Sequence, residues 1–143
     1  MSTAQTLPPF HLAFPVRCLD EARAFYGTLL GCSEGRSSPE WIDFNFYGHQ
    51  IVAHLAPAEC QPAQTSEVDN EHVPVRHFGV VLDMESWKEL AQRLHEQNCD
   101  FIIEPTIRFQ GQAGEQATLF IRDPSGNALE FKAFHDLNAL FAK

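Results

Sequence analysis

Three side chains, His11, His77 and Glu130, have the types and positions that can bind a divalent metal ion. Two neutral imidazoles and one carboxylate make a facial triad, which leaves coordination positions open for substrate or dioxygen on a metal such as Fe(II). Imidazole nitrogen also suits Zn(II), Ni(II) and Mn(II), so the ligand types leave these alternatives open. We therefore expect a divalent metal, and the ligand types alone do not choose which one.

The alternation of apolar residues puts all three side chains on the same kind of surface. Neighbouring side chains of a strand point to opposite faces. In FHLAFPV (10–16), the apolar residues at 10, 12 and 14 are predicted to face the core, which leaves His11 on the other face. The same rule separates His77 from the apolar positions of HFGVVL, and Glu130 from those of NALEFKAF. Three non-core positions on strands therefore predict a shared cleft.

Other candidates lie on these non-core faces or across from Glu130. Pairing across the last hairpin puts Phe120 or a neighbour opposite Glu130. For proton transfer we expect His54 and Asp43 as catalytic candidates. The expected substrate contacts are Trp41, Asn45, Phe120 and Lys132.

His54 also has a second interpretation, as a fourth metal ligand, which the sequence leaves open. It has the right strand parity, but it stands two positions further from its turn glycine, Gly48, than Glu130 stands from Gly126. The position that matches Glu130 in this count is Val52. His54 is therefore either a ligand or a neighbour of the metal and substrate.

Two similar halves are expected to position these residues. Each reads as a strand, an amphipathic helix and a closing hairpin, with strand starts at 10 and 76, helices over 19–31 and 83–99, and hairpins over 40–55 and 117–134. We predict an α+β fold in a single domain, 1–143, with a βαβββ unit used twice. Module 1 spans about 8–56, a linker about 57–74, and module 2 about 75–135. An unrelated α+β meander is the alternative.

Composition limits the partners. The formal net charge of -9 repels nucleic acid and anionic lipid alike. No apolar stretch is long enough to cross a bilayer, and MSTAQTLPPF lacks the pattern of a signal peptide, so we expect a cytoplasmic protein. The 4 cysteines stand singly, which favours reduced thiols. The polar stretch TIRFQGQAGEQA receives no role.

Four stretches carry a family resemblance: FHLAFPV, DEARAFYGTLLGC, RHFGVVL and FIRDPSGNALEF. Together they resemble the vicinal oxygen chelate superfamily, which includes glyoxalase I, fosfomycin-resistance thioltransferases, bleomycin-binding proteins and extradiol ring-cleavage dioxygenases. The resemblance implies two βαβββ modules whose curved mixed sheets form a cup-shaped metal and substrate cleft. By position, His11, His77 and Glu130 match the metal ligands of the family. It also implies a homodimer, in which the modules pair within one chain or across two.

Within this superfamily, the set of two histidines and one glutamate looks most like that of extradiol dioxygenases, which use Fe(II). The sequence departs from them in one respect, because no tyrosine lies in the neighbourhood of Phe120, where such enzymes often use one for proton transfer. The expected function is a metal-dependent dioxygenase acting on a small, aromatic, oxygen-chelating substrate. The alternatives are a glyoxalase-like isomerase or lyase, favoured by four ligands, and a metal-free protein that binds an antibiotic or metabolite.

Overall fold

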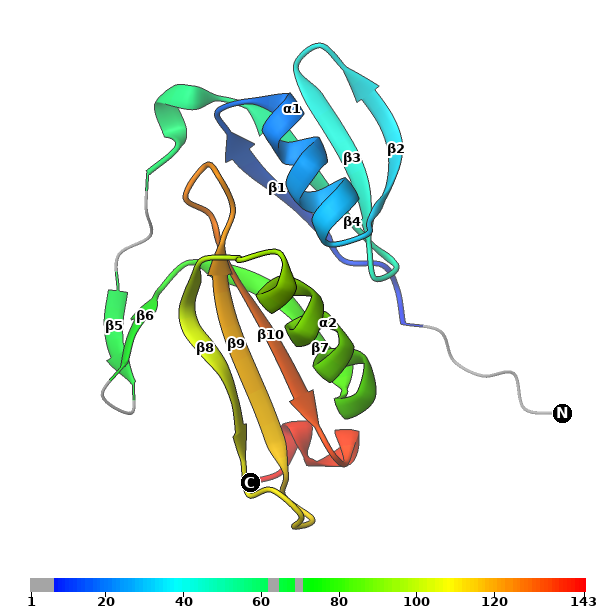
Figure 1. Cartoon of the computed structure of the whole chain (residues 1–143). Helices are drawn as coiled ribbons and strands as arrows, with labels where there is room; N and C mark the ends of the chain where they lie inside the picture. The colour runs from blue at the N-terminus through cyan, green and yellow to red at the C-terminus, as the bar shows by residue number, and fades with distance from the viewer. Residues whose placement is uncertain (1–6, 62–64, 69–70) are drawn as a thin grey trace, which may run out of the picture. The chain divides into compact units, whose positions relative to one another are not determined.

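The computed structural model describes residues 7–61, 65–68 and 71–143, and the chain divides into two compact units, Met1–Glu59 (unit 1) and Cys60–Lys143 (unit 2). Each unit holds a four-stranded mixed sheet with a helix packed on one face (Figure 1). This confirms the predicted α+β class with a βαβββ unit used twice. Among the described residues, no helix is both long and apolar enough to span a bilayer.

Unit 1 follows the order β1 (His11–Val16), α1 (Leu19–Ala22), a π-helical segment (Arg23–Leu29), β2 (Ser33–Ser38), β3 (Trp41–Phe46) and β4 (His49–Leu55). A short 3-10 turn, Pro57–Glu59, ends it. The strand order in the sheet is β1-β4-β3-β2, and β1 runs parallel to β4. The first strand of the unit therefore lies beside the last.

Unit 2 repeats this arrangement with β7 (His77–Asp83), α2 (Met84–Glu96), β8 (Phe101–Arg108), β9 (Gln116–Arg122) and β10 (Ala128–Phe134). A 3-10 segment, Leu137–Phe141, follows. The order is β7-β10-β9-β8, again with the first strand parallel to the last. Before β7, the strands β5 (Thr65–Val68) and β6 (Glu71–Pro74) form a small hairpin.

The helix-facing side of each sheet is the core. In unit 1, Tyr26 is fully buried and its ring packs against Phe14 and Phe44, with centroid distances of 5.2 and 5.6 Å. In unit 2, Trp87 of α2 is buried and its Nε1 donates to the main-chain O of Phe131 at 2.9 Å. Since Phe131 follows Glu130, the covered face of β10 leaves Glu130 on the open face.

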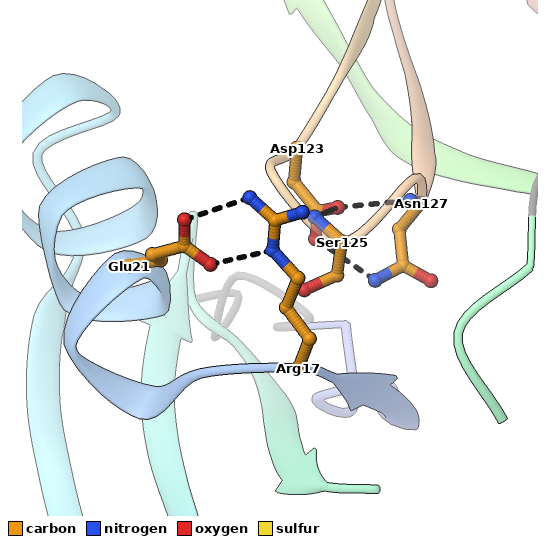
Figure 2. Close-up of polar contacts among 5 residues, drawn as sticks. All are labelled: Arg17, Glu21, Asp123, Ser125 and Asn127. Atoms are coloured by element: carbon orange, nitrogen blue, oxygen red, sulfur yellow. Dashed lines mark hydrogen bonds and ion pairs between the residues drawn. The ribbon is translucent and has the colours of Figure 1, made fainter. Parts of the chain in front are cut away.

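The turns at which β4 and β10 begin match the expected hairpins. Tyr47 and Gly48 both have positive φ, which suits a tight two-residue turn between antiparallel strands. Before β10, the buried carboxylate of Asp123 accepts hydrogen bonds from the main-chain N of Ser125 and of Asn127 (Figure 2). This network shapes the turn from which β10, and with it Glu130, starts.

Four details differ from the expectations. The sequence reading missed β2, because SEGRSS has no apolar residue. The first helix continues from α1 as π-helix, although Gly31 does have the expected positive φ. The linker contains the β5–β6 hairpin, while 62–64 and 69–70 lie outside the described residues. Phe10, expected in the core, is 64% exposed because it precedes β1.

An ion pair at the start of α1 and the four cysteines are the remaining features of the described residues that bear on the sequence predictions. Arg17 makes two hydrogen bonds to Glu21, at 2.7 and 2.8 Å, which orient the side chains at the start of α1 (Figure 2). Hydrogen bonding by Arg17 lowers the pKa of the Glu21 carboxyl. Cys18, Cys32, Cys60 and Cys99 all lie in the described residues, and no disulfide joins them.

Candidate functional site

The imidazole of His77 has a defined tautomer. Its Nδ1 lies 2.6 Å from the main-chain O of Pro74. Because a carbonyl oxygen can only accept, Nδ1 carries the hydrogen, and in the neutral ring Nε2 presents a lone pair. That Nε2 lies 3.3 Å from Oε1 of Glu130. Two groups that both accept hydrogen bonds thus point at the same space.

The carboxylate oxygen of Glu130 that does not face His77 accepts a hydrogen bond. Thr118 Oγ1 donates to Glu130 Oε2 at 2.6 Å, and Phe120 is the residue directly opposite Glu130 in β9, as the hairpin count predicted. The two side chains of the pair are mostly shielded, with 28% of His77 and 18% of Glu130 exposed. One carboxylate oxygen is therefore bound by the protein, while the other faces His77.

Gly79 lets β7 approach Glu130. It is the register partner of Glu130 in β10, and a Cβ built on Gly79 would overlap the main-chain O of Glu130. In unit 1 the residue matching Gly79 is Ala13, opposite Val52. The close approach thus belongs to the strand pair that carries His77 and Glu130.

His11, on β1 of unit 1, has a side-chain partner instead of a carbonyl. Its Nδ1 lies 2.7 Å from Gln50 Oε1, and Gln50 Nε2 donates to Asp43 Oδ2 at 3.4 Å. With the amide nitrogen directed at the carboxylate, the amide oxygen accepts from Nδ1–H of His11. His11 and His77 therefore hold the same tautomer, with Nε2 as the lone-pair nitrogen.

The strand register separates His54 from the position of Glu130. In unit 2, β7 and β10 pair His77 with Ala128 and Gly79 with Glu130. In unit 1, β1 and β4 pair His11 with Gln50 and Ala13 with Val52, whereas His54 pairs with Pro15. His54 therefore matches Lys132, about 7 Å further along the strand than the residue that matches Glu130.

Of the other predicted residues, Phe120 belongs to unit 2, whereas Trp41, Asp43 and Asn45 lie on β3 of unit 1. Phe120 is 3% exposed, and its ring meets that of His77 edge-on at 4.9 Å between centroids. Asp43 is buried and is bonded to Gln50, and Asn45 Oδ1 accepts from the main-chain N of Gly48. Trp41 lies under the guanidinium of Arg36, 5.9 Å from the ring centroid. Asn45 and Asp43 thus already serve contacts within unit 1.

Unit 2 contains a hollow of about 500 Å³ on the open face of its sheet, here called the unit 2 hollow. Its lining includes His77, Phe120, Glu130 and Lys132, so the structure brings four of the predicted residues together. Asp43 and Asn45 line a separate hollow in unit 1 with Gln50 and Arg36. Among the described residues, no three His, Cys, Asp or Glu side chains form a group that could hold a metal.

Sequence reasoning missed the residues that support these side chains: Gln50, Pro74, Gly79, Arg108 and Thr118. Strand alternation indicates which face a residue occupies, and Thr118 shares the face of Glu130 by that rule. The rule carries no information on which neighbour donates to which carboxylate. Arg108 lines the unit 2 hollow although its stretch received no role.

Comparisons with known proteins agree with this architecture. Residues 9–131 match the family model of the Glyoxalase/Bleomycin resistance protein/Dioxygenase superfamily. A crystal structure of a glyoxalase/bleomycin resistance protein/dioxygenase from Alicyclobacillus acidocaldarius is 34% identical, covers 97% of this chain and 100% of its own, and superposes with a TM-score of 0.74. No curated protein matches the sequence.

More distant structures share the fold alone. The fosfomycin resistance protein FosX from Listeria monocytogenes is 17% identical, with a TM-score of 0.69 over 94% of this chain and 98% of its own. A lactoylglutathione lyase from Agrobacterium tumefaciens is 19% identical, with a TM-score of 0.63 over 99% of this chain and 100% of its own. These proteins carry different activities on one architecture.

Proposed function

The chain belongs to the Glyoxalase/Bleomycin resistance protein/Dioxygenase superfamily, and from this premise we propose that it is a metal-dependent enzyme of the extradiol dioxygenase type. Its substrate is a small aromatic molecule with two neighbouring oxygens. The metal is held by His11, His77 and Glu130, and Fe(II) is the first choice among divalent ions. We expect the enzyme to be a cytoplasmic homodimer.

One observation carries the proposal: the lone pair of His77 Nε2 and Oε1 of Glu130 face each other at 3.3 Å. Two acceptors at this separation need a positive charge between them, which either a proton on His77 Nε2 or a divalent cation supplies, and we propose the cation. Nitrogen and carboxylate oxygen suit such an ion. The groups behind them, Pro74 O and Thr118 Oγ1, act as outer partners that orient metal ligands.

His11 is proposed as the third ligand because its Nδ1 is engaged in the same way as that of His77, which leaves Nε2 available. It comes from unit 1 of the same chain or of a second copy. When bound, a divalent metal supplies Lewis-acid polarisation of two neighbouring substrate oxygens and open positions for dioxygen. Phe120 would pack against the substrate ring, and His54 remains a candidate for proton transfer.

Three ligands, rather than four, support the dioxygenase type over a glyoxalase-like lyase or isomerase. Val52 matches the register position of Glu130, and Val52 is an apolar, buried residue that cannot bind a metal. His54, which the sequence left open as either a fourth ligand or a neighbour of the metal, matches Lys132 in register. A triad keeps the open positions that a reaction with dioxygen requires.

The proposed activity is tested by anaerobic reconstitution with Fe(II), followed by oxygen uptake with a panel of catechols. We expect uptake with at least one of them, and a ring-opened product that absorbs at longer wavelength than the catechol. The Glu130→Gln variant is expected to show no uptake above the rate without protein. Absence of uptake with every catechol by the Fe(II)-loaded native protein would contradict the dioxygenase activity.

A separate prediction concerns Gln50, which accepts from His11 Nδ1. The Gln50→Leu variant removes this acceptor, so we expect the dissociation constant for Zn(II) to rise by about 10- to 100-fold, the usual cost of losing an outer partner of a ligating histidine. Competition with a chromogenic chelator measures this constant without redox chemistry. Gln50→Glu keeps an acceptor oxygen and is expected to restore part of the affinity.

The matched control is Gln97→Leu, which makes the same chemical change at an exposed residue just after α2. It is expected to bind Zn(II) as the native protein does. If Gln50→Leu also binds Zn(II) with native affinity while both variants unfold at the native temperature, Gln50 does not orient a ligand.

A further inference from the structure

A chain of hydrogen bonds in unit 1 runs from His11 on β1 to a buried carboxylate on β3. Gln50 on β4 is the register partner of His11, and its Oε1 lies 2.7 Å from His11 Nδ1. At the other end of the amide, Gln50 Nε2 donates to Asp43 Oδ2 at 3.4 Å. His11 and Gln50 are exposed, whereas Asp43 is buried. The chain of bonds therefore joins an exposed imidazole to a buried carboxylate.

The side chain of Gln50 crosses diagonally from β4 to Asp43. In β3 the register partner of Gln50 is Asn45, but Asn45 Oδ1 accepts from the main-chain N of Gly48 at 2.7 Å. Asp43 is two residues from Asn45 along the same strand, and so lies on the same face of the sheet. Long side chains reach such diagonal neighbours. An exposed glutamine is thus fixed at its far end by a buried residue.

The Asp43 carboxylate determines which way round the Gln50 amide lies. An ionised carboxylate only accepts hydrogen bonds, so the amide nitrogen faces Asp43 and the amide oxygen faces His11. The amide oxygen accepts in turn, so Nδ1 of His11 carries the hydrogen and Nε2 has the lone pair. With a neutral amide at position 43, both orientations of the Gln50 amide are bonded, because a ring nitrogen either donates or accepts. The tautomer of His11 is therefore set two side chains away.

His77 holds the same tautomer by a different means. Its Nδ1 donates to the main-chain O of Pro74 at 2.6 Å. A main-chain carbonyl oxygen never becomes a donor, whereas a side-chain amide can turn over and exchange its oxygen for its nitrogen. In water the neutral histidine ring favours the hydrogen on Nε2. Of the two histidines, His11 is therefore the one whose tautomer depends on other side chains.

The surroundings of Asp43 keep its carboxylate in place. A Cβ built on Gly35 would lie 3.3 Å from Cβ of Asp43, so β2 packs closely against this residue. A cation, Arg36, has its Nε 4.0 Å from Asp43 Oδ2, but its side chain is 85% exposed and its guanidinium lies over the ring of Trp41. Ion pairs of such exposed side chains contribute little. The shorter contact of Asp43 Oδ2 is the one with Gln50.

We propose that Asp43 is a positioning residue, which acts through Gln50 to keep the hydrogen of His11 on Nδ1 and so leaves Nε2 available to a metal. The role of His11 as a ligand rests on the proposed function, whereas the control of its tautomer does not. Hydrogen-bond partners behind a ligating imidazole fix its tautomer and its orientation. Asp43, expected from the sequence to transfer protons, then orients a ligand without touching the substrate.

Nitrogen-15 NMR of the imidazole rings tests the inference on the metal-free full chain at about pH 8, above the usual pKa of a histidine side chain. The chemical shifts of the two ring nitrogens show which one carries the hydrogen. In the native protein we expect the hydrogen on Nδ1 in both His11 and His77. In Asp43→Asn the new amide donates as well as accepts, so we expect most His11 rings to carry the hydrogen on Nε2. His77 in the same sample should not change.

A double variant moves the charge along the chain of bonds. In Asp43→Asn, Gln50→Glu the carboxylate at position 50 accepts both from His11 and from the amide at position 43, so the hydrogen of His11 should return to Nδ1. The dissociation constant for Zn(II) should rise by about 3- to 10-fold in Asp43→Asn, less than for loss of a direct outer partner, and should fall again in the double variant. Asp20→Asn makes the same change at an exposed carboxylate of α1 and should keep the native tautomer and affinity.

The inference is overturned if His11 of the native protein carries its hydrogen on Nε2, a result that needs no variant. It is also overturned if His11 keeps the hydrogen on Nδ1 in a folded Asp43→Asn protein, because a merely structural role of Asp43 lowers the unfolding temperature without moving the tautomer. Failure of the proposed function gives a different result. The tautomer of His11 then changes as expected, while Zn(II) binds to neither the native protein nor the variants.

Discussion

The His77→Ala variant is expected to lose its bound metal, with the dissociation constant for Zn(II) rising by at least 100-fold. The substitution removes one of the three proposed ligands, so Glu130 no longer faces an imidazole nitrogen. When the free metal concentration is 100 times the dissociation constant, binding to the folded chain stabilises it by about 2.7 kcal/mol. The native protein should therefore unfold several degrees higher with metal than without, whereas His77→Ala should show almost no such shift.

Elemental analysis of both proteins as purified, together with thermal unfolding at increasing Zn(II), measures this effect. The matched control is His95→Ala, because His95 is an exposed histidine on α2. It should keep the native metal content and the native shift. Metal content and stabilisation that are equal in His77→Ala and native protein would exclude His77 as a ligand. A native protein that no divalent ion stabilises would instead favour a metal-free binding protein.

Most of the fold was predictable because its signals are local. Alternating apolar residues indicated β3, β4, β9 and β10, and the Tyr47-Gly48 and Pro124–Gly126 turns located the two hairpins. The repetition of strand, helix and hairpin then predicted the twofold use of one unit. β2 escaped prediction because a strand at the sheet edge, exposed on most of its length, needs no apolar residue.

For the candidate site, the sequence predicted only which face of its strand each residue occupies and which residues pair across the last hairpin. Alternation put Glu130 on the open face, and the hairpin count correctly paired it with Phe120. The contacts of Gln50 with His11, and of Thr118 with Glu130, depend on side-chain rotamers that no spacing rule describes. For the same reason the sequence did not show that Asp43, predicted to be catalytic, accepts a hydrogen bond from Gln50. That bond links Asp43 to His11 through the Gln50 side chain.

Gly79→Ala is the second variant with a large expected effect, because Gly79 stands against the main chain of Glu130. The added Cβ would overlap Glu130 O and would lie 2.6 Å from its carbonyl carbon, so one of the two strands has to move. Main-chain atoms in the centre of a sheet cannot rotate away as a side chain does. Overpacking typically costs about 1–3 kcal/mol and occasionally more, and this backbone contact is expected to exceed about 3 kcal/mol.

Urea unfolding of Gly79→Ala measures the loss in free energy, and Gly114→Ala is the matched control because a Cβ at Gly114 meets no atom within 4 Å. The control should stay within about 0.5 kcal/mol of the native protein. Any Gly79→Ala protein that folds should also bind Zn(II) more weakly, since a displaced β10 carries Glu130 away from His77. Native stability in Gly79→Ala would mean that β7 and β10 separate without cost. Native metal affinity in a destabilised Gly79→Ala would mean that Gly79 supports the sheet but does not position Glu130.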